Sequence, residues 1–287
     1  MIARLLLNTA VIGSGYAFMA MAFNLMYAVS PFFNMTLGAV SVLAGYIVYL
    51  CLQMNLPIVL AWLIGVGTAV AFSCFLEGCI YTPMRSKGAS SMILMVASLG
   101  IYIIFESVIR LSFGPQYQLL ENISSQKMLN IFSLNLPLVQ ALIIVISLII
   151  FIILQLLLKY TFLGKSIRAV HNSRTLAEII GLNIRMIIFT VSAICGFILG
   201  LYGILTGYDT GLVPTLGFNL LFKGMIGAII GGLATLSGAY WGALFLALAE
   251  NIGVMFFASE WRDLIAFVVF IAFLFFKPQG IFQKKTE

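Results

Sequence analysis

The stretch LVQALIIVISLIIFIILQLLL occupies residues 138–158 and decides the fold class. It is long enough for one α-helix to cross the hydrocarbon layer of a bilayer, which takes about 20 apolar residues. A transmembrane β-strand would instead alternate apolar and polar residues over segments of about ten, and this stretch does not alternate. The sequence therefore predicts a membrane-spanning helix here.

The rest of the chain has the same character. Hydrophobic residues make up 62% of the 287 residues, charged residues make up 8%, and the mean hydropathy is +1.14. A soluble domain of this length does not have that balance, so we expect an all-α polytopic membrane protein, with residues 1–287 in a single transmembrane domain. The net charge of +6 indicates orientation and contact with anionic lipid headgroups, and it does not imply nucleic acid.

About nine transmembrane helices are predicted, within a range of eight to ten. The candidate spans are 5–29, 37–53, 57–80, 91–112, 137–158, 186–206, 219–234, 239–257 and 262–277. The segment 219–234 is short and glycine-rich, so it is either a span or a re-entrant segment. Nine crossings place the amino terminus outside and the carboxyl terminus inside, with 114–136 as the longest outside loop.

One long basic interruption, KYTFLGKSIRAVHNSRTLAEIIGLNIR, covers residues 159–185. Five Lys and Arg residues face a single acid, Glu178. Membrane proteins concentrate Lys and Arg in their cytoplasmic loops, so we expect this loop on the cytoplasmic side.

The loop contains signals for a short helix. Thr175 and Glu178 have the spacing of a capping box, and Gly181 stands where a helix ends in the left-handed conformation. Three apolar residues would share one face of this helix: Leu176, Ile179 and Ile180. That face packs either on the membrane surface and the protein's own spans, or on a soluble cytoplasmic partner.

Two places have the pattern of broken helices. Pro31 interrupts an apolar run, and Asn34 can replace a lost backbone hydrogen-bond partner. The second break, 207–217, contains Asp209 and Pro214. Non-helical backbone at membrane depth persists only where protein or a water-lined path covers it, so either break is a candidate pathway lining. A surface loop between complete spans is the alternative for the second.

Charged side chains are rare within the predicted spans. Glu106 and Arg110 are four residues apart with the acid first, which predicts a helical ion pair, with a substrate-contacting role as the alternative. Glu77 stands near Arg85 at a span boundary, and Lys223 is expected to reach the outer headgroups.

Signatures of catalysis or metal binding are missing from the sequence. Gly164-Lys165-Ser166 matches the end of a P-loop, but position 159 is Lys instead of Gly and a membrane helix precedes it. His171 is the only histidine, and the four cysteines form no C-x-x-C pair. We expect no enzyme activity, no catalytic residues, and no metal or cofactor bound by this chain.

Over nearly its whole length, the chain resembles the permease subunits of ABC importers for branched-chain amino acids. The resemblance runs in chain order through Gly15-Tyr16-Ala17, Met26-Tyr27, Asn34-x-x-x-Gly38, Tyr81-x-Pro83-x-Arg85, Gly164-x-x-x-Arg168-Ala169, Ala177-x-x-x-Gly181-Leu182-Asn183, Pro214-x-x-Gly217, Lys223, Gly231-Gly232, Ser237-Gly238-Ala239-x-x-Gly242 and Lys277-Pro278-Gln279-Gly280-Ile281-Phe282. The chain departs from the family at Met35-Thr36-Leu37, where a His is missing, and at Ala234-Thr235, where Gly-Ser is usual.

The resemblance implies a partner set: two ATPase subunits that bind ATP and Mg, a second homologous permease subunit, and an extracytoplasmic substrate-binding protein. It also implies a multi-pass location in the bacterial inner membrane. The residues expected to couple to the ATPase are Gly164, Arg168, Ala169, Thr175, Leu176, Ala177, Glu178, Ile179, Ile180 and Gly181. Those expected along the translocation pathway are Asn34, Thr36, Gly38, Asp209, Pro214 and Gly217.

Branched-chain amino acids are the expected substrate. Because the chain departs from the family at two places, urea, short amides or another small polar solute are alternatives. A stand-alone secondary transporter or channel is the alternative from a different class.

Overall fold

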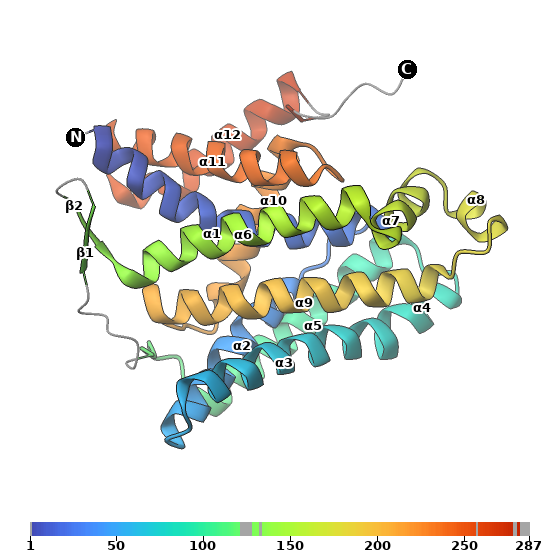
Figure 1. Cartoon of the computed structure of the whole chain (residues 1–287), viewed down its shortest axis with the longest axis horizontal. Helices are drawn as coiled ribbons and strands as arrows, with labels where there is room; N and C mark the ends of the chain where they lie inside the picture. Colours follow the sequence, from blue (N-terminus) through green and yellow to red (C-terminus); the bar gives the residue numbers. More distant parts are fainter. Residues whose placement is uncertain (1, 121–127, 132–133, 257, 278–279, 282–287) are drawn as a thin grey trace.

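The computed structural model describes residues 2–120, 128–131, 134–256, 258–277 and 280–281. Long helices lie roughly side by side and form one bundle, with loops and short helices at its two ends (Figure 1). The helices are α1 (Ile2–Val29), α2 (Thr36–Gln53), α3 (Ile58–Phe75), the π-helix η1 (Leu76–Tyr81), α4 (Thr82–Ser86), α5 (Ser91–Phe113), α6 (Leu138–Tyr160), α7 (Phe162–Asn172), α8 (Arg174–Ile179), α9 (Ile184–Asp209), α10 (Leu216–Gly231), α11 (Leu236–Phe256), the 3-10 helix η2 (Ser259–Trp261) and α12 (Arg262–Phe276).

Seven helices of the described chain are long and apolar enough to cross a membrane, judged by length and composition. They are α1, α2, α3 with its extension to Ser86, α5, α6, α9 and α11. The predicted spans 219–234 and 262–277 correspond to α10 and α12, which are shorter helices. A multi-pass helical architecture is therefore confirmed.

The helix α1 forms the centre of the bundle. It packs against α6, α9, α10 and α11, and the large side chains Phe18 and Phe23 are fully buried in it. Phe18 also stacks on Tyr202 of α9, with ring centroids 5.2 Å apart. A helix that is apolar all round, as α1 is, belongs in such a central position.

The outer helices have the opposite pattern. Large apolar side chains of α3, α5, α6 and α12 remain exposed, among them Leu63, Ile104, Ile153 and Val268. In water such a surface would be unfavourable, whereas lipid chains cover it without that penalty. The exposed apolar surface thus agrees with a bilayer around the bundle.

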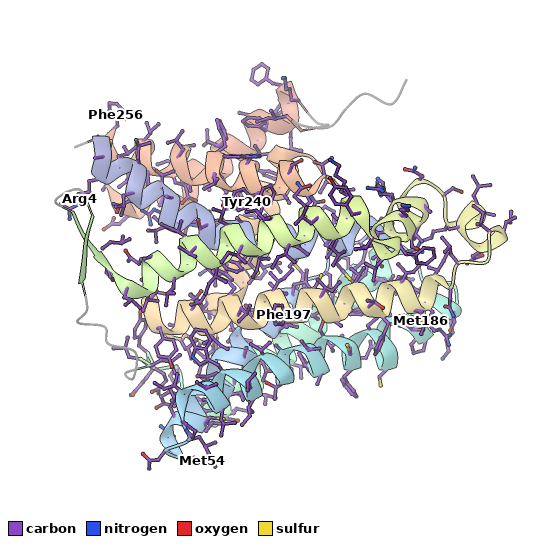
Figure 2. The ribbon with its side chains drawn as sticks, viewed as in Figure 1. Arg4, Met54, Met186, Phe197, Tyr240 and Phe256 are labelled. Atoms are coloured by element: carbon purple, nitrogen blue, oxygen red, sulfur yellow. The ribbon has the colours of Figure 1, made fainter. Side chains whose placement is uncertain are left out.

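The two ends of the bundle differ. Arg4, Met54 and Phe256 lie at one end and Met186 lies at the other (Figure 2). The first end carries a hairpin in which β1 (Met128–Ile131) pairs antiparallel with β2 (Leu134–Pro137), within the loop predicted for 114–136. The second end carries α4, α7 and α8 (Figure 1).

Candidate functional site

The loop 159–185 folds into two helices, of which the sequence analysis found only α8. The additional helix, α7, begins after Thr161, whose side chain accepts a hydrogen bond from the Gly164 backbone N–H at 3.2 Å. Its buried face includes Ile167 and Val170. The apolar residues at 163, 167 and 170 have helical spacing and were the available signal for α7.

The exposed face of α8 carries the three apolar residues predicted for it. Leu176 is 59% exposed, and Ile179 and Ile180 are each 75% exposed. On the opposite face Ala177 is buried. The helix is therefore seated on the protein by one side and presents an apolar surface on the other.

The start of α8 differs from the prediction. The N-cap is Ser173, whose hydroxyl accepts a hydrogen bond from the Leu176 N–H at 3.3 Å, so the capping box expected at Thr175 and Glu178 is wrong. Thr175 lies inside the helix because Ser173 already has the extended backbone needed where α7 ends.

The end of α8 agrees with the prediction. Gly181 has a φ of +87°, and the Leu182 N–H donates to the Ala177 carbonyl at 3.0 Å. The Gly181 N–H donates to the Glu178 carbonyl at 2.9 Å. These are the two hydrogen bonds of a Schellman motif, which gives the helix a sharp stop.

An arginine that the sequence analysis did not select ties α8 to the bundle. The Arg174 guanidinium donates from Nη2 to the carbonyl of Val29, the last residue of α1, at 2.6 Å. Burial, followed by the nearby positive charge of Arg85, lowers the pKa of Arg174. A chain-distant carbonyl as partner leaves no pattern in the sequence, so no signal was available.

Two other predicted coupling residues hold α7 against α6. A Cβ on Gly164 would clash with the backbone of Leu157 and Leu158, so only glycine permits this approach. The Arg168 side chain then donates from Nη1 to the Leu158 carbonyl at 2.8 Å. Ala169, the remaining residue of this set, is half-buried on α7.

The first predicted break lies between α1 and α2; Ser30, Phe32 and Asn34 in it are buried, and Pro31 is exposed. The Asn34 Oδ1 atom accepts from the Thr36 N–H at 3.1 Å and from the Thr36 hydroxyl at 2.6 Å. The Tyr81 hydroxyl of η1 also donates to Asn34 Oδ1, at 3.2 Å. The amide oxygen thus supplies an acceptor for the first backbone N–H of α2, which differs from the prediction that it would replace the donor missing at Pro31.

The second break follows α9 and lies against the segment that follows α5. Asp209 accepts from the Gln140 side-chain amide at 3.0 Å, and Pro214 is buried. Leu212 forms an antiparallel bridge with Gln118, with N–H to carbonyl distances of 2.8 and 3.1 Å. Gly211, Leu212 and Pro214 are buried while Thr210 and Thr215 are exposed, so this segment is partly covered by the rest of the protein.

The two breaks meet at a pair of glycines. A Cβ on Gly38 would lie 2.5 Å from the Gly217 carbonyl oxygen, and a Cβ on Gly217 would lie 2.5 Å from that of Gly38. Four of the six predicted pathway residues (Asn34, Thr36, Gly38 and Gly217) are therefore buried around one junction of α2 with α10. Asp209 and Pro214 belong to the second break.

A cluster of charges around the buried Glu250 connects α1, α10, α11 and α12. The Lys223 ammonium lies 2.9 Å from Asp263 and 3.4 Å from Glu250, so the expectation that Lys223 reaches the outer headgroups is wrong. The Tyr16 hydroxyl donates to Glu250 at 2.8 Å, and Arg262 lies 3.8 Å from the same carboxylate. Pairing of this kind lowers the cost of charge within a membrane.

The other two expected ion pairs are present. Arg85 makes a bidentate pair with Glu77, at 2.6 and 2.9 Å, and Arg110 pairs with Glu106. Within the described residues, no group of three or more His, Cys, Asp or Glu side chains is placed to hold a metal ion.

A bundle with seven helices long and apolar enough to cross a membrane, and with paired charges inside, defines a multi-pass helical membrane protein. Residues 5–274 match the family described as branched-chain amino acid transport system, permease component, and the chain belongs to that family. The resemblance found in the sequence is thereby confirmed, and the chain is a multi-pass protein of the inner membrane.

Relatives match over nearly their full length. The high-affinity branched-chain amino acid transport system permease protein LivH of Escherichia coli is 24% identical, covering 96% of this chain and 93% of that protein. BraD of Pseudomonas aeruginosa is 25% identical, covering 96% and 94%. The probable branched-chain amino acid transport permease protein LivH of Methanocaldococcus jannaschii is 24% identical, and the match covers 97% of this chain and 92% of that protein.

Among solved structures, PsaBC from Streptococcus pneumoniae in complex with Fab has a similar fold. The TM-score is 0.52 at 13% sequence identity, and the match covers 97% of both chains. At this identity the likeness concerns the fold alone.

Proposed function

We propose that this chain is the transmembrane permease subunit of an ATP-driven importer that carries branched-chain amino acids. The observation that carries the proposal is the exposed apolar face of Leu176, Ile179 and Ile180 on an otherwise anchored short helix. Family membership supports the substrate class, because the relatives' names specify branched-chain amino acid transport.

The helix α8 serves as the coupling helix that docks on an ATPase subunit. Three exposed apolar side chains on one face would be unfavourable in water, and binding to a partner surface would shield them from water. A helix this short is marginal alone, and here the cap at Ser173, the stop at Gly181 and the buried Ala177 hold it in shape.

Movement of α8 reaches the membrane interior through Arg174. Its hydrogen bond to Val29 joins α8 to the last residue of α1, directly before the break that contains Asn34. A pull on α8 by the ATPase would pass from Val29 along the first break, through Asn34 and Thr36, to Gly38 of α2. The solute path runs along the junction of α2 with α10 and the second break, beside Asn34, Thr36, Gly38, Asp209, Pro214 and Gly217.

The chain crosses the membrane nine times, with the seven long helices joined by α10 and α12. Thr9 of α1 accepts from Asn251, which in turn accepts from Arg262 at the start of α12. The other end of α12 leads to Gly280, which packs on Gly232. The two termini are then on opposite sides, and the basic end with α7 and α8 is cytoplasmic.

The remaining components belong to other chains. Two ATPase subunits bind ATP and Mg, a second homologous permease completes the membrane domain, and a substrate-binding protein delivers solute outside. The non-cytoplasmic end carries a cavity of about 460 Å³ that Tyr49, Tyr117 and Gln118 line, which suits the receipt of a small polar solute.

Co-purification tests the docking surface. Replacing both Ile179 and Ile180 with Asp should abolish recovery of the ATPase with the tagged chain in mild detergent, while membrane insertion is unchanged. The matched control is Met54→Asp, because Met54 is 74% exposed but lies at the opposite end of the bundle. Undiminished ATPase recovery with the double variant would refute docking through α8.

Uptake assays test the substrate. With all partners present, we expect ATP-dependent accumulation of labelled leucine, isoleucine or valine. Accumulation of urea or short amides in their place would assign the chain to one of those solutes. Uptake that persists without any ATPase would show a stand-alone transporter or channel.

A further inference from the structure

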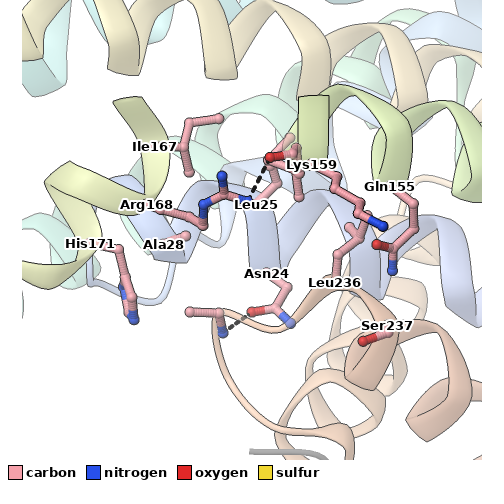
Figure 3. A pocket seen from close by; sticks show the side chains of 12 residues that line it. Asn24, Leu25, Ala28, Gln155, Lys159, Ile167, Arg168, His171, Leu236 and Ser237 are labelled. Carbon is pink, nitrogen blue, oxygen red and sulfur yellow. Dashed lines mark hydrogen bonds between the residues drawn. The ribbon is translucent and has the colours of Figure 1, made fainter. Parts of the chain in front are cut away.

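A pocket of about 280 Å³ opens at the basic end of the bundle, between α1, α6, α7 and the turn that precedes α11 (Figure 3). Lys159 and Gln155 enter it from α6, and Arg168 and His171 enter from α7. The pocket is separate from the exposed face of α8 and from the two breaks, so the proposed function does not use it.

The charge of this pocket is positive. Among its lining residues are two cations, Lys159 and Arg168, and a histidine, and none of the lining residues is an acid. Within the part of the chain that the structure describes, Lys159, Arg168 and His171 take part in no ion pair. Uncompensated donors converging on a small cavity favour an anion with several acceptor oxygens.

The cations are held in place before any ligand arrives. Gly164 lets α7 approach α6 so closely that Arg168 reaches the Leu158 carbonyl, at 2.8 Å from Nη1. An arginine carries five N–H donors, so one hydrogen bond to the carbonyl leaves most of them for a ligand. Lys159 is placed by the last turn of α6 and lies over the ring of Tyr160.

The apolar residues that line the rest of the pocket indicate which kind of anion it binds. Leu25, Leu158 and Leu236 supply apolar surface, and Lys159 marks the point where the apolar helix α6 ends. A pocket with a basic rim and an apolar wall at the end of a span matches a phospholipid, whose phosphate lies at headgroup depth above its acyl chains. A soluble phosphate has no use for the apolar wall.

We propose that this pocket binds the phosphate of an anionic phospholipid, with Lys159 and Arg168 as the charged contacts and Ser237 and Gln155 as neutral partners for the headgroup. Binding would place one lipid between α6, α7 and the turn before α11. The site thereby joins the coupling loop to the membrane surface through a ligand and not only through protein contacts.

Native mass spectrometry of the complex in nanodiscs tests the proposal. The probes are bilayers of phosphatidylcholine alone and of phosphatidylcholine with phosphatidylglycerol. We expect a phosphatidylglycerol molecule to stay bound to the wild-type complex. We expect its retention to fall at least tenfold in Lys159→Gln and further when Arg168→Gln is added.

The control variant is Lys165→Gln, since Lys165 is an exposed cation of α7 that does not line the pocket. Equal loss of lipid in Lys165→Gln would show general charge attraction and would overturn the site. Equal retention of phosphatidylcholine would overturn it too.

Competition with inorganic phosphate distinguishes a lipid site from a site for a soluble anion. Displacement of phosphatidylglycerol by millimolar phosphate, with phosphate bound in its place, would show a soluble-anion site and overturn the lipid assignment. Lys159→Gln alone removes only an exposed side chain, so loss of lipid there is interpretable even where Arg168→Gln disturbs the loop. Lipid retention is read without transport, so its failure is separate from failure of the proposed function.

Discussion

Gly38 of α2 and Gly217 of α10 touch backbone to backbone. Each would place a Cβ 2.5 Å from the other's carbonyl oxygen, although the two residues are far apart in the sequence. Small residues at such crossings let helices in lipid approach closely. Because both glycines adjoin broken segments, this contact joins the two interruptions of the bundle into one junction.

An alanine at either glycine should damage this junction. In Gly38→Ala or Gly217→Ala the added methyl meets backbone and not a flexible side chain, so overpacking should cost about 1–3 kcal/mol and lower transport. Thermal unfolding in detergent and solute uptake in vesicles measure the two effects.

The matched control for this prediction is Gly67→Ala. Gly67 lies inside α3, and no other group comes within 4 Å of the place that an added methyl would occupy, so alanine should stabilise the helix by up to about 1 kcal/mol. If Gly38→Ala behaved like Gly67→Ala, the close crossing would not exist in the protein.

Replacing Glu250 alone should destabilise the protein more than replacing Glu250 and Lys223 together. Glu250→Gln removes the buried counter-charge of Lys223 and Arg262, and Lys223 keeps only the exposed Asp263, so the cost should approach about 3–5 kcal/mol, as for a broken buried pair. Adding Lys223→Met removes the more buried of the two cations that face the neutral amide, so part of the loss should return. Unfolding temperatures of the two single variants and the double variant measure the coupling, and strictly additive losses would argue against it.

Asn24 should control the turn between α10 and α11. Its side-chain amide donates to the carbonyls of Gly232 and Thr235 at 3.2 and 2.9 Å, and its oxygen accepts from the Ala234 N–H. Ala234 has a φ of +66°, which is uncommon for a residue with a side chain, so the turn depends on these contacts.

In Asn24→Ala, buried backbone groups lose their partners at about 1–3 kcal/mol each, and protease cleavage at 232–235 should accelerate. Asn24→Asp keeps an acceptor for Ala234 but sets a buried carboxylate oxygen against the carbonyls of Gly232 and Thr235, so cleavage at least as fast as in Asn24→Ala is expected. An unchanged cleavage rate in Asn24→Ala would count against this role.

Replacing Arg174 should impair coupling to transport without impairing docking of the ATPase. Arg174→Gln shortens and neutralises the side chain that reaches Val29, but it leaves Leu176, Ile179 and Ile180 in place. The ATPase should still co-purify, while solute uptake per ATP hydrolysed falls by at least about tenfold, because a charged hydrogen bond contributes about 1.5–3 kcal/mol.

The control for Arg174 is Arg185→Gln, an exposed charge in the first turn of α9. It should leave both readouts unchanged. Loss of ATPase binding in Arg174→Gln, without loss in Arg185→Gln, would mean that Arg174 contributes to docking itself.

Some local features followed from the sequence because neighbouring residues decide them. The stop at Gly181 and the exposed face of α8 depend on spacing along one helix, and the pair of Glu106 with Arg110 lies within one helix. The first break at Pro31 is a backbone effect of proline. The N-cap predicted for α8 was wrong because Ser173 and Thr175 both carry a hydroxyl that can cap a helix. Ser173 is the residue with extended backbone, since α7 ends there.

The sequence by itself determined the membrane class, the approximate spans, the basic loop and the family, because hydropathy and motif order are properties of the chain. Only the tertiary structure decided that Gly38 meets Gly217, that Lys223 pairs with the buried Glu250 and the exposed Asp263, and that Arg174 reaches Val29. In lipid, helices associate through close packing and polar contacts, and an apolar pattern on every face does not reveal which neighbour each helix will choose.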